Sequence, residues 1–252
     1  MIDISQKEAF IFDLDGTLAE SKQALDPEMG ALLKRLLEVR KVAVITGGSW
    51  SQIQRQFAQQ MPADSKFDNL FLFPTSGTAF YRRTIKGWQE VYSEKLAEAD
   101  RQKIRSILLE SEARLGMTEP HIYGERVEDR GSQITYSALG QDAPVDVKKA
   151  WDPDQSKRRQ IVALAAPFLT GFTVGIGGMT SIDVTKGGSD KGLGVQKVAE
   201  ALDIPISKMV FIGDALYPGG NDYPARSTGI DCVEVAGPKE TKEFIEKSCR
   251  QP

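Results

Sequence analysis

The sequence predicts an α/β protein with a Rossmann-like parallel sheet and an inserted α+β domain. Two observations predict this class. At both ends of the chain, apolar strand-like runs alternate with amphipathic helices, which is typical of parallel sheets with right-handed crossovers. Between them, residues 83–185 contain a long polar helix and short alternating strands, which are typical of α+β domains. We therefore expect a core of residues 1–82 and 186–252 and an insertion of residues 83–185.

The first part of the expected core contains three strands and two helices. Residues 8–14 form an apolar run like that of a strand buried on both faces. Leucines and a methionine recur at helical spacing over residues 27–40. Residues 41–46 and 69–73 are short apolar runs typical of strands, and Ser49 is suited to cap a helix between them.

The closing part of the chain resumes the alternation. A helix is expected at 191–202, strands at 208–214 and 231–236, and a last helix at 239–247. These elements would complete the parallel sheet begun near the N-terminus.

The middle of the chain has a different sequence pattern. We expect helices at 95–115 and 155–168, a strand at 132–139, and a strand pair in "GFTVGIGG" and "TSIDVT". This segment predicts helices packed on an antiparallel sheet.

The charge and cysteine content exclude several classes of function. The 252 residues include 32 basic and 35 acidic side chains, with no basic cluster suited to a nucleic acid or an anionic membrane. Two cysteines are too few for a disulfide framework, and the N-terminus lacks the pattern of a signal peptide. We expect a cytoplasmic protein whose partner is a small molecule.

The stretch "AFIFDLDGTL" ends a buried strand with two carboxylates, Asp13 and Asp15. Burying an unpaired carboxylate is unfavourable by several kcal/mol, so a compensating group is expected. Thr46 and Asp214 also end expected parallel strands, and ligands bind at this edge of open parallel sheets. Oxygen ligands of this kind suit Mg²⁺, and an aspartate there can act as a nucleophile toward phosphorus.

Four motifs carry a family resemblance: "DLDGT", "ITGGS", the lysine of "SDKGLG", and "GDALYPGGND". In this order they resemble the haloacid dehalogenase superfamily of aspartate-based phosphotransferases, and the insertion is similar to its class IIB cap. The segments "GGMTSIDVTKGGSDKG" and "FIGDALYPGGNDYPARSTG" resemble the eukaryotic-type phosphomannomutases closely.

The resemblance implies roles for four carboxylates. Asp13 would be the phosphorylated nucleophile and Asp15 the general acid and base, whose backbone carbonyl also reaches Mg²⁺. Asp214 would be a further metal ligand, supported by Asp222 from the same loop.

The resemblance also implies which residues would hold the phosphoryl group. The resemblance assigns Thr46 and Lys191 to its oxygens, and Gly47 and Gly48 would let backbone N–H groups approach it.

The cap would bind the sugar phosphate, and a homodimer through the cap is possible by the same resemblance. The matching cap positions are Arg130, Ser181 and Asp183. Phosphomannomutases use several arginines on the distal phosphate, whereas the matching positions here are Lys22, Gln141 and Lys148. Because these side chains cannot reproduce bidentate arginine contacts, we expect a sugar-phosphate phosphatase, with a phosphohexomutase as the alternative.

Three alternatives stay open at this point. Ser181 and Asp183 could be the polar face of a strand, and Arg130 could pair with neighbouring acidic residues. The whole chain could also be a non-catalytic sugar-phosphate-binding protein, although every catalytic motif is present.

Overall fold

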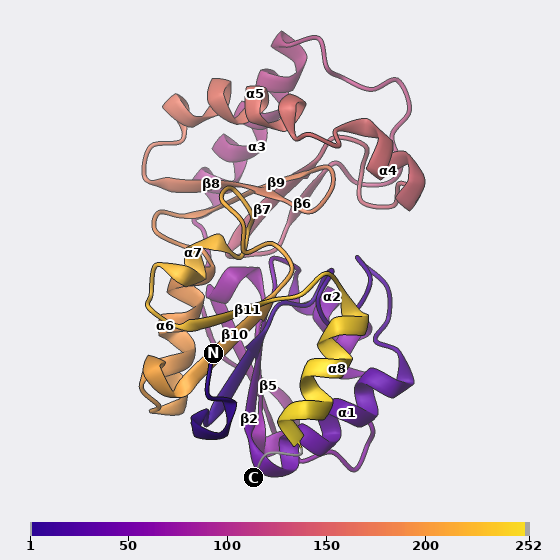
Figure 1. Ribbon diagram of the computed structural model, residues 1–252. Helices are drawn as coiled ribbons and strands as arrows, with labels where there is room; N and C mark the ends of the chain where they lie inside the picture. The colour runs from indigo at the N-terminus through magenta and orange to yellow at the C-terminus, as the bar shows by residue number, and fades with distance from the viewer. Residues whose placement is uncertain (1, 250–252) are drawn as a thin grey trace. The chain divides into compact units, whose positions relative to one another are not determined.

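The computed structural model describes residues 2–249, which divide into two compact units (Figure 1). The core unit comprises the residues up to Tyr92 and from Asp190, and the cap unit is Ser93–Ser189. The first boundary therefore lies ten residues beyond the expected 83, because two antiparallel strands after Phe73 extend the core sheet. The second boundary lies four residues beyond the expected 185.

The core unit contains a seven-stranded sheet in the order β11-β10-β1-β2-β3-β4-β5. The strands from β11 to β3 are parallel, which confirms the expected Rossmann-like class, and β4 runs antiparallel to β3. The strand bounds are β1 Ala9–Phe12, β2 Lys41–Ile45, β3 Leu70–Phe73, β4 Ala79–Thr84, β5 Gly87–Ser93, β10 Met209–Gly213 and β11 Asp231–Glu234.

Helices cover both faces of this sheet. They are α1 Pro27–Val39, α2 Trp50–Ile53, α6 Lys191–Leu202, α7 Tyr223–Arg226 and α8 Pro238–Cys249, with short turns η1 Ile4–Gln6, η2 Gln54–Ala58, η3 Phe67–Asn69, η4 Thr75–Gly77 and η6 Ile206–Lys208. Alternate residues of β1 serve the two faces: Phe10 and Phe12 pack in the cluster formed by α1 and α8, and Ile11 packs in the cluster formed by α6. Burial on both faces explains the continuous apolar runs of the strands.

Two aspartates define where the main core helices begin. The Asp26 carboxylate accepts a hydrogen bond from the Met29 N–H, and Pro27 follows at the first helical position of α1. Asp190 caps α6 in the same way by accepting from the Leu193 N–H. Because Asp190 is the N-cap residue, α6 begins at Lys191.

The cap unit has an antiparallel sheet in the order β6-β7-β9-β8, as the α+β expectation required. Its elements are α3 Glu98–Arg114, β6 Val127–Asp129, β7 Gln133–Ser137, α4 Val145–Trp151, α5 Ser156–Ala165, η5 Ala166–Phe168, β8 Phe172–Gly177 and β9 Ser181–Lys186. Ile134 and Tyr136 on one face of β7 pack with Ile104 of α3 and Ile161 of α5. The alternate residues of β7 are polar, so the sheet has one apolar and one polar face.

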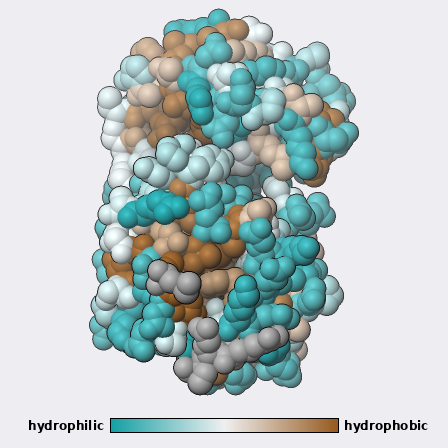
Figure 2. All heavy atoms as spheres, in the orientation of Figure 1, coloured by the Kyte–Doolittle hydropathy of each residue, from teal (hydrophilic) through white to brown (hydrophobic). Residues whose placement is uncertain are grey.

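The outward face of α8 carries charged residues and forms a hydrophilic surface (Figure 2). Among residues 2–249, the longest and most apolar helices still fall short of what a bilayer crossing requires.

Candidate active site

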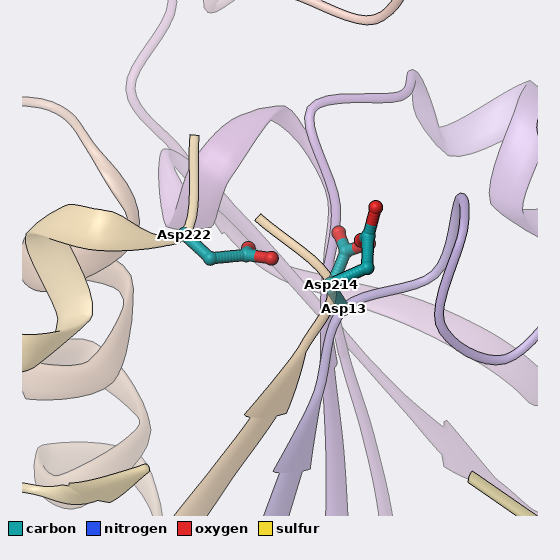
Figure 3. Close-up of side chains that lie close together, drawn as sticks. All are labelled: Asp13, Asp214 and Asp222. Atoms are coloured by element: carbon teal, nitrogen blue, oxygen red, sulfur yellow. The ribbon is translucent and has the colours of Figure 1, made fainter. Parts of the chain in front are cut away.

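The carboxyl ends of β1 and β10 bring Asp13 and Asp214 together (Figure 3). The two strands are paired in parallel, and the Asp13 N–H donates to the Ile212 carbonyl at 2.9 Å. Asp222, just before α7, points toward the other two carboxylates. One oxygen of each lies within 4.8 Å of the other two, so the sequence prediction that these segments converge is confirmed.

Lys191 supplies the positive charge of this cluster. Its ammonium group contacts the Oδ1 atoms of both Asp13 and Asp222, and all three side chains are buried. The other oxygen of Asp222 accepts from the Ala215 N–H at 3.1 Å. Both oxygens of Asp222 thus have protein partners, which suits a residue that holds Lys191 and the Asp214 loop in place.

Burial raises the pKa of Asp13 well above its usual value, and the Asp222 and Asp214 carboxylates add to the rise against the opposing effect of Lys191. The pKa of Asp214 is raised by burial and then by Asp222. Burial alone would lower the pKa of Lys191, but the two neighbouring carboxylates outweigh it and raise that pKa. The lysine therefore stays protonated at any physiological pH.

The donor set fits a divalent cation. Were all three carboxylates ionised, they and the one ammonium would leave two uncompensated negative charges at this site. Hard oxygen ligands are those that Mg²⁺ prefers, and a 2+ charge would balance the cluster. Asp13 and Asp214 would bind it directly.

Gly16 is the residue that allows Asp214 to approach this closely. A Cβ at Gly16 would lie 2.6 Å from Asp214 Oδ2, and Gly16 has a φ of +93°. Thr17 Oγ1 donates to Asp214 Oδ1 at 3.1 Å. The "DGT" part of the first motif thus positions the carboxylate contributed by the last motif.

Asp15 lies apart from the three clustered carboxylates and is held by other groups. Its Oδ1 accepts from Gln56 Nε2 and from the Lys22 N–H, each at 2.7 Å, and its Oδ2 accepts from Gln52 Nε2 at 3.3 Å. Sequence reasoning missed both glutamines. The signal that could have found them is a pair of amides four residues apart on the helix that follows the glycine loop.

Hydrogen bonds to backbone groups fix the shape of the loop that follows β2. Thr46 Oγ1 accepts from the Gly48 N–H at 3.0 Å. Thr75 and Ser76 of η4, with φ of 50° and 57°, donate their N–H groups to the Gly48 and Thr46 carbonyls at 3.0 and 2.9 Å. Left-handed residues other than glycine are strained and cluster at functional sites, so η4 stabilises a specific shape of the segment that contains Gly47.

The polar face of the cap sheet contains Asp183, which accepts a 2.7 Å hydrogen bond from Thr135 Oγ1. Ser181 pairs with Ser137 in the same sheet. Arg130 makes an ion pair with Glu128, with Nε and Nη2 at 2.9 and 2.6 Å from one carboxylate oxygen.

Lys148 is buried and donates its ammonium proton to the Gln141 carbonyl at 2.9 Å. The two positions expected to meet the distal phosphate are therefore neighbours within the cap unit. The core residue of that group, Lys22, contacts Asp15 through its backbone N–H.

A sequence profile described as eukaryotic phosphomannomutase matches residues 29–250. The chain belongs to this family. It is 29% identical over 219 residues to phosphomannomutase 1 of Mus musculus, with 84% of this chain and 80% of the mouse protein covered. It is also 29% identical over 225 residues to a phosphomannomutase of Schizosaccharomyces pombe, with 86% and 84% covered.

Solved structures share the fold at low identity. An N-terminally truncated, IMP-bound Plasmodium falciparum IMP-nucleotidase aligns with a TM-score of 0.69 and 17% identity, covering 98% of this chain and 68% of that one. A trehalose-6-phosphate phosphatase related protein aligns with a TM-score of 0.56 and 17% identity, covering 96% and 97%. The haloacid dehalogenase fold expected from the motifs is confirmed, and membership of the family supports phosphoryl transfer on sugar phosphates.

Proposed function

We propose that this protein is a phosphohexomutase that transfers a phosphoryl group between positions of a hexose phosphate through a phosphorylated Asp13. The observation that carries the proposal is the buried contact of Asp13 with Lys191, next to Asp214, at the end of β1. Phosphomannomutase relatives support the mutase over the phosphatase that the cap substitutions led us to expect.

In the proposed chemistry, an Asp13 oxygen forms a bond to phosphorus while the bond from phosphorus to the sugar oxygen breaks. Asp15, two residues along the same loop, gives a proton to the departing sugar oxygen. In the return step Asp15 takes a proton from the accepting hydroxyl, and the phosphoryl group leaves Asp13. Lys191 and Thr46 offset the charge on the phosphoryl oxygens during both steps.

Asp13 and Asp214 would hold Mg²⁺ next to the phosphoryl group, and the backbone carbonyl of Asp15 would be the further ligand. The bound ion supplies positive charge where negative charge accumulates. Asp222 would act by keeping Lys191 and the Asp214 loop in position, since its two oxygens already accept from Lys191 and Ala215.

The cap unit would bind the rest of the sugar phosphate through its polar face. Asp183 and Ser181 suit hydroxyl groups, and Arg130 suits a phosphate. Gln141 and Lys148, which are neighbours in the cap unit, would hold a distal phosphate.

Hydrolysis is the second candidate, and Gln141 is the observation that favours it. An amide binds a phosphate less strongly than a bidentate guanidinium, so a bisphosphorylated intermediate would be retained less well. Water would then take the place of the sugar hydroxyl in the return step.

A paired assay tests both candidates. Purified protein with Mg²⁺ receives mannose 1-phosphate or glucose 1-phosphate with a trace of the corresponding 1,6-bisphosphate, and free phosphate and the 6-phosphate ester are followed together. Ester without free phosphate supports the mutase, and free phosphate without ester supports the phosphatase. Turnover that survives Asp13→Asn would contradict both, because both require the nucleophile.

A further inference from the structure

The segment that follows α2 is wound as a π-helix. It spans Gln54–Ala58, and the Gln59 N–H donates to the Gln54 carbonyl at 2.9 Å, five residues back. Single π turns within helices are uncommon and are frequent at functional sites, because the wider turn changes which side chains share a face. Here the π turn includes Gln56 and directly follows the α-helical turn that includes Gln52.

Both glutamines point their amides at Asp15. Gln56 is buried, with 5% of its surface exposed, and its Nε2 donates to Asp15 Oδ1 at 2.7 Å. The Nε2 of Gln52 donates to Asp15 Oδ2 at 3.3 Å and to Gln56 Oε1 at 3.2 Å. Since Gln56 Oε1 accepts from Gln52, the Gln56 amide can face Asp15 only with its NH₂ group.

The Asp15 carboxylate is therefore held at both oxygens. The third donor is the Lys22 N–H, which shares Oδ1 with Gln56. Three donors from two segments of the chain restrict the rotation of the Asp15 side chain, and a buried polar group such as the Gln56 amide is costly unless it is satisfied. A structural role alone does not explain why a buried glutamine, Gln56, and a half-buried one, Gln52, both meet a loop carboxylate rather than apolar neighbours.

We propose that Gln56, assisted by Gln52, is a positioning residue that orients Asp15 for proton transfer to the sugar oxygen. This inference rests on the proposed function, in which Asp15 is the acid and base. The glutamines act through Asp15 and do not contact the reacting phosphorus, so their effect should depend on whether the leaving group needs a proton.

The leaving group provides the readout. When Asp13 attacks a hexose phosphate, the sugar oxygen must gain a proton as its bond to phosphorus breaks. When Asp13 attacks p-nitrophenyl phosphate, the nitrophenolate leaves without one. A loss of Asp15 orientation should therefore slow transfer from the sugar and spare transfer from the aryl ester.

The test uses the full chain with Mg²⁺ and compares Gln56→Met and Gln52→Met with Gln59→Met. Gln59 lies just beyond the π turn and is exposed, so it controls for the same chemical change in the same segment. Single-turnover phosphorylation of Asp13 is measured with a hexose phosphate and with p-nitrophenyl phosphate, and each melting temperature is recorded. For Gln56→Met we expect a fall of about 10- to 100-fold with the sugar and at most about 2-fold with the aryl ester.

Equal falls with both substrates, or sugar rates like those of Gln59→Met, would overturn the inference. If Gln56→Met does not fold, Gln52→Met at the half-buried position gives the same comparison, with a smaller expected effect of about 3- to 10-fold. Failure of the proposed function looks different: the unaltered protein would then form no phosphorylated Asp13 from a hexose phosphate, whatever the glutamine variants do.

Discussion

Replacing Lys191 by methionine removes the one ammonium that, among residues 2–249, contacts Asp13 and Asp222, and leaves their carboxylates facing each other in a buried site. Two unit charges about 4 Å apart interact by about 4 kcal/mol at an effective dielectric constant of about 20. Deleting one partner of a buried ion pair costs about 3–5 kcal/mol. Because proteins unfold with a free energy of only about 5–15 kcal/mol, we expect Lys191→Met to destabilise the core unit severely at neutral pH.

The assay is urea unfolding of both proteins in the presence of a chelator at pH 5 and pH 8. With a slope of about 2 kcal/mol per M, the expected loss lowers the unfolding midpoint by about 1.5–2.5 M at pH 8. The raised pKa of Lys191 means that its own titration contributes stability fully below the usual lysine value and loses it only at much higher pH, so Lys191 itself adds no pH dependence between pH 5 and pH 8.

The difference between the two proteins should nevertheless be smaller at pH 5. Without Lys191, the pKa of Asp13 rises further, and the folded variant takes up a proton that the unfolded chain does not. Its stability therefore falls more steeply than that of the parent as the pH rises. Lys197→Met is the matched control on the same helix, since Lys197 pairs at 3.4 Å with the exposed Glu200 and its loss should cost less than about 1 kcal/mol. A loss like that of the control, or one independent of pH, would refute the reasoning.

Three further predictions concern the carboxylate cluster of the core unit and the cap residue Gln141. Gly16→Ala should destabilise the protein by about 1–3 kcal/mol and remove Mg²⁺-dependent turnover, because the new Cβ would lie 2.6 Å from Asp214 Oδ2. The control is Gly87→Ala, at a φ of +94° with no atom near the new Cβ, which should lower the melting temperature through backbone strain and leave turnover unchanged. Mg²⁺ at about 100 times its dissociation constant should stabilise the protein by about 2.7 kcal/mol. At a fixed Mg²⁺ concentration the stabilisation should be larger at pH 8 than at pH 5.5, because the pKa values of Asp13 and Asp214 are raised and protons on them compete with the metal. Equal shifts of the melting temperature at both pH values would contradict this. Gln141→Arg should raise the ratio of 6-phosphate ester to free phosphate in the paired assay, and an unchanged ratio would show that this position does not retain the intermediate.

The pattern of apolar runs predicted the core closely. The helix from Pro27 begins where expected and the first strand begins one residue later than expected, at Ala9, because a parallel sheet buried on both faces requires continuous apolar strands between amphipathic helices. The hairpin β4–β5 was divided by the boundary expected at residue 83, which assigned β5 to the insertion. Pairing with β3, which no local pattern reveals, makes it part of the core sheet.

The residues of the candidate site also divide into those that the sequence predicted and those that it did not. Asp13 and Asp214 were predictable because each follows a strand whose bounds the local sequence indicates, whereas Lys191 was predicted from the family resemblance. The partners of Asp15 were not, since they depend on the winding of the Gln54–Ala58 turn and on an approach between two segments about forty residues apart. The roles of the cap residues and a dimer through the cap stay predictions.

Through the family resemblance the sequence predicts phosphoryl transfer to an aspartate, and by itself it determined the class of fold and the motifs at the carboxyl ends of the strands. These follow from hydrophobic periodicity and from residues adjacent in the chain. Only the tertiary structure decided that Lys191 is shared between Asp13 and Asp222, that Arg130 pairs with Glu128, and that Asp15 is held by glutamine amides. The choice among several possible partners for a charged or polar group is made by distances of a few ångströms, and those distances arise only when the elements are packed.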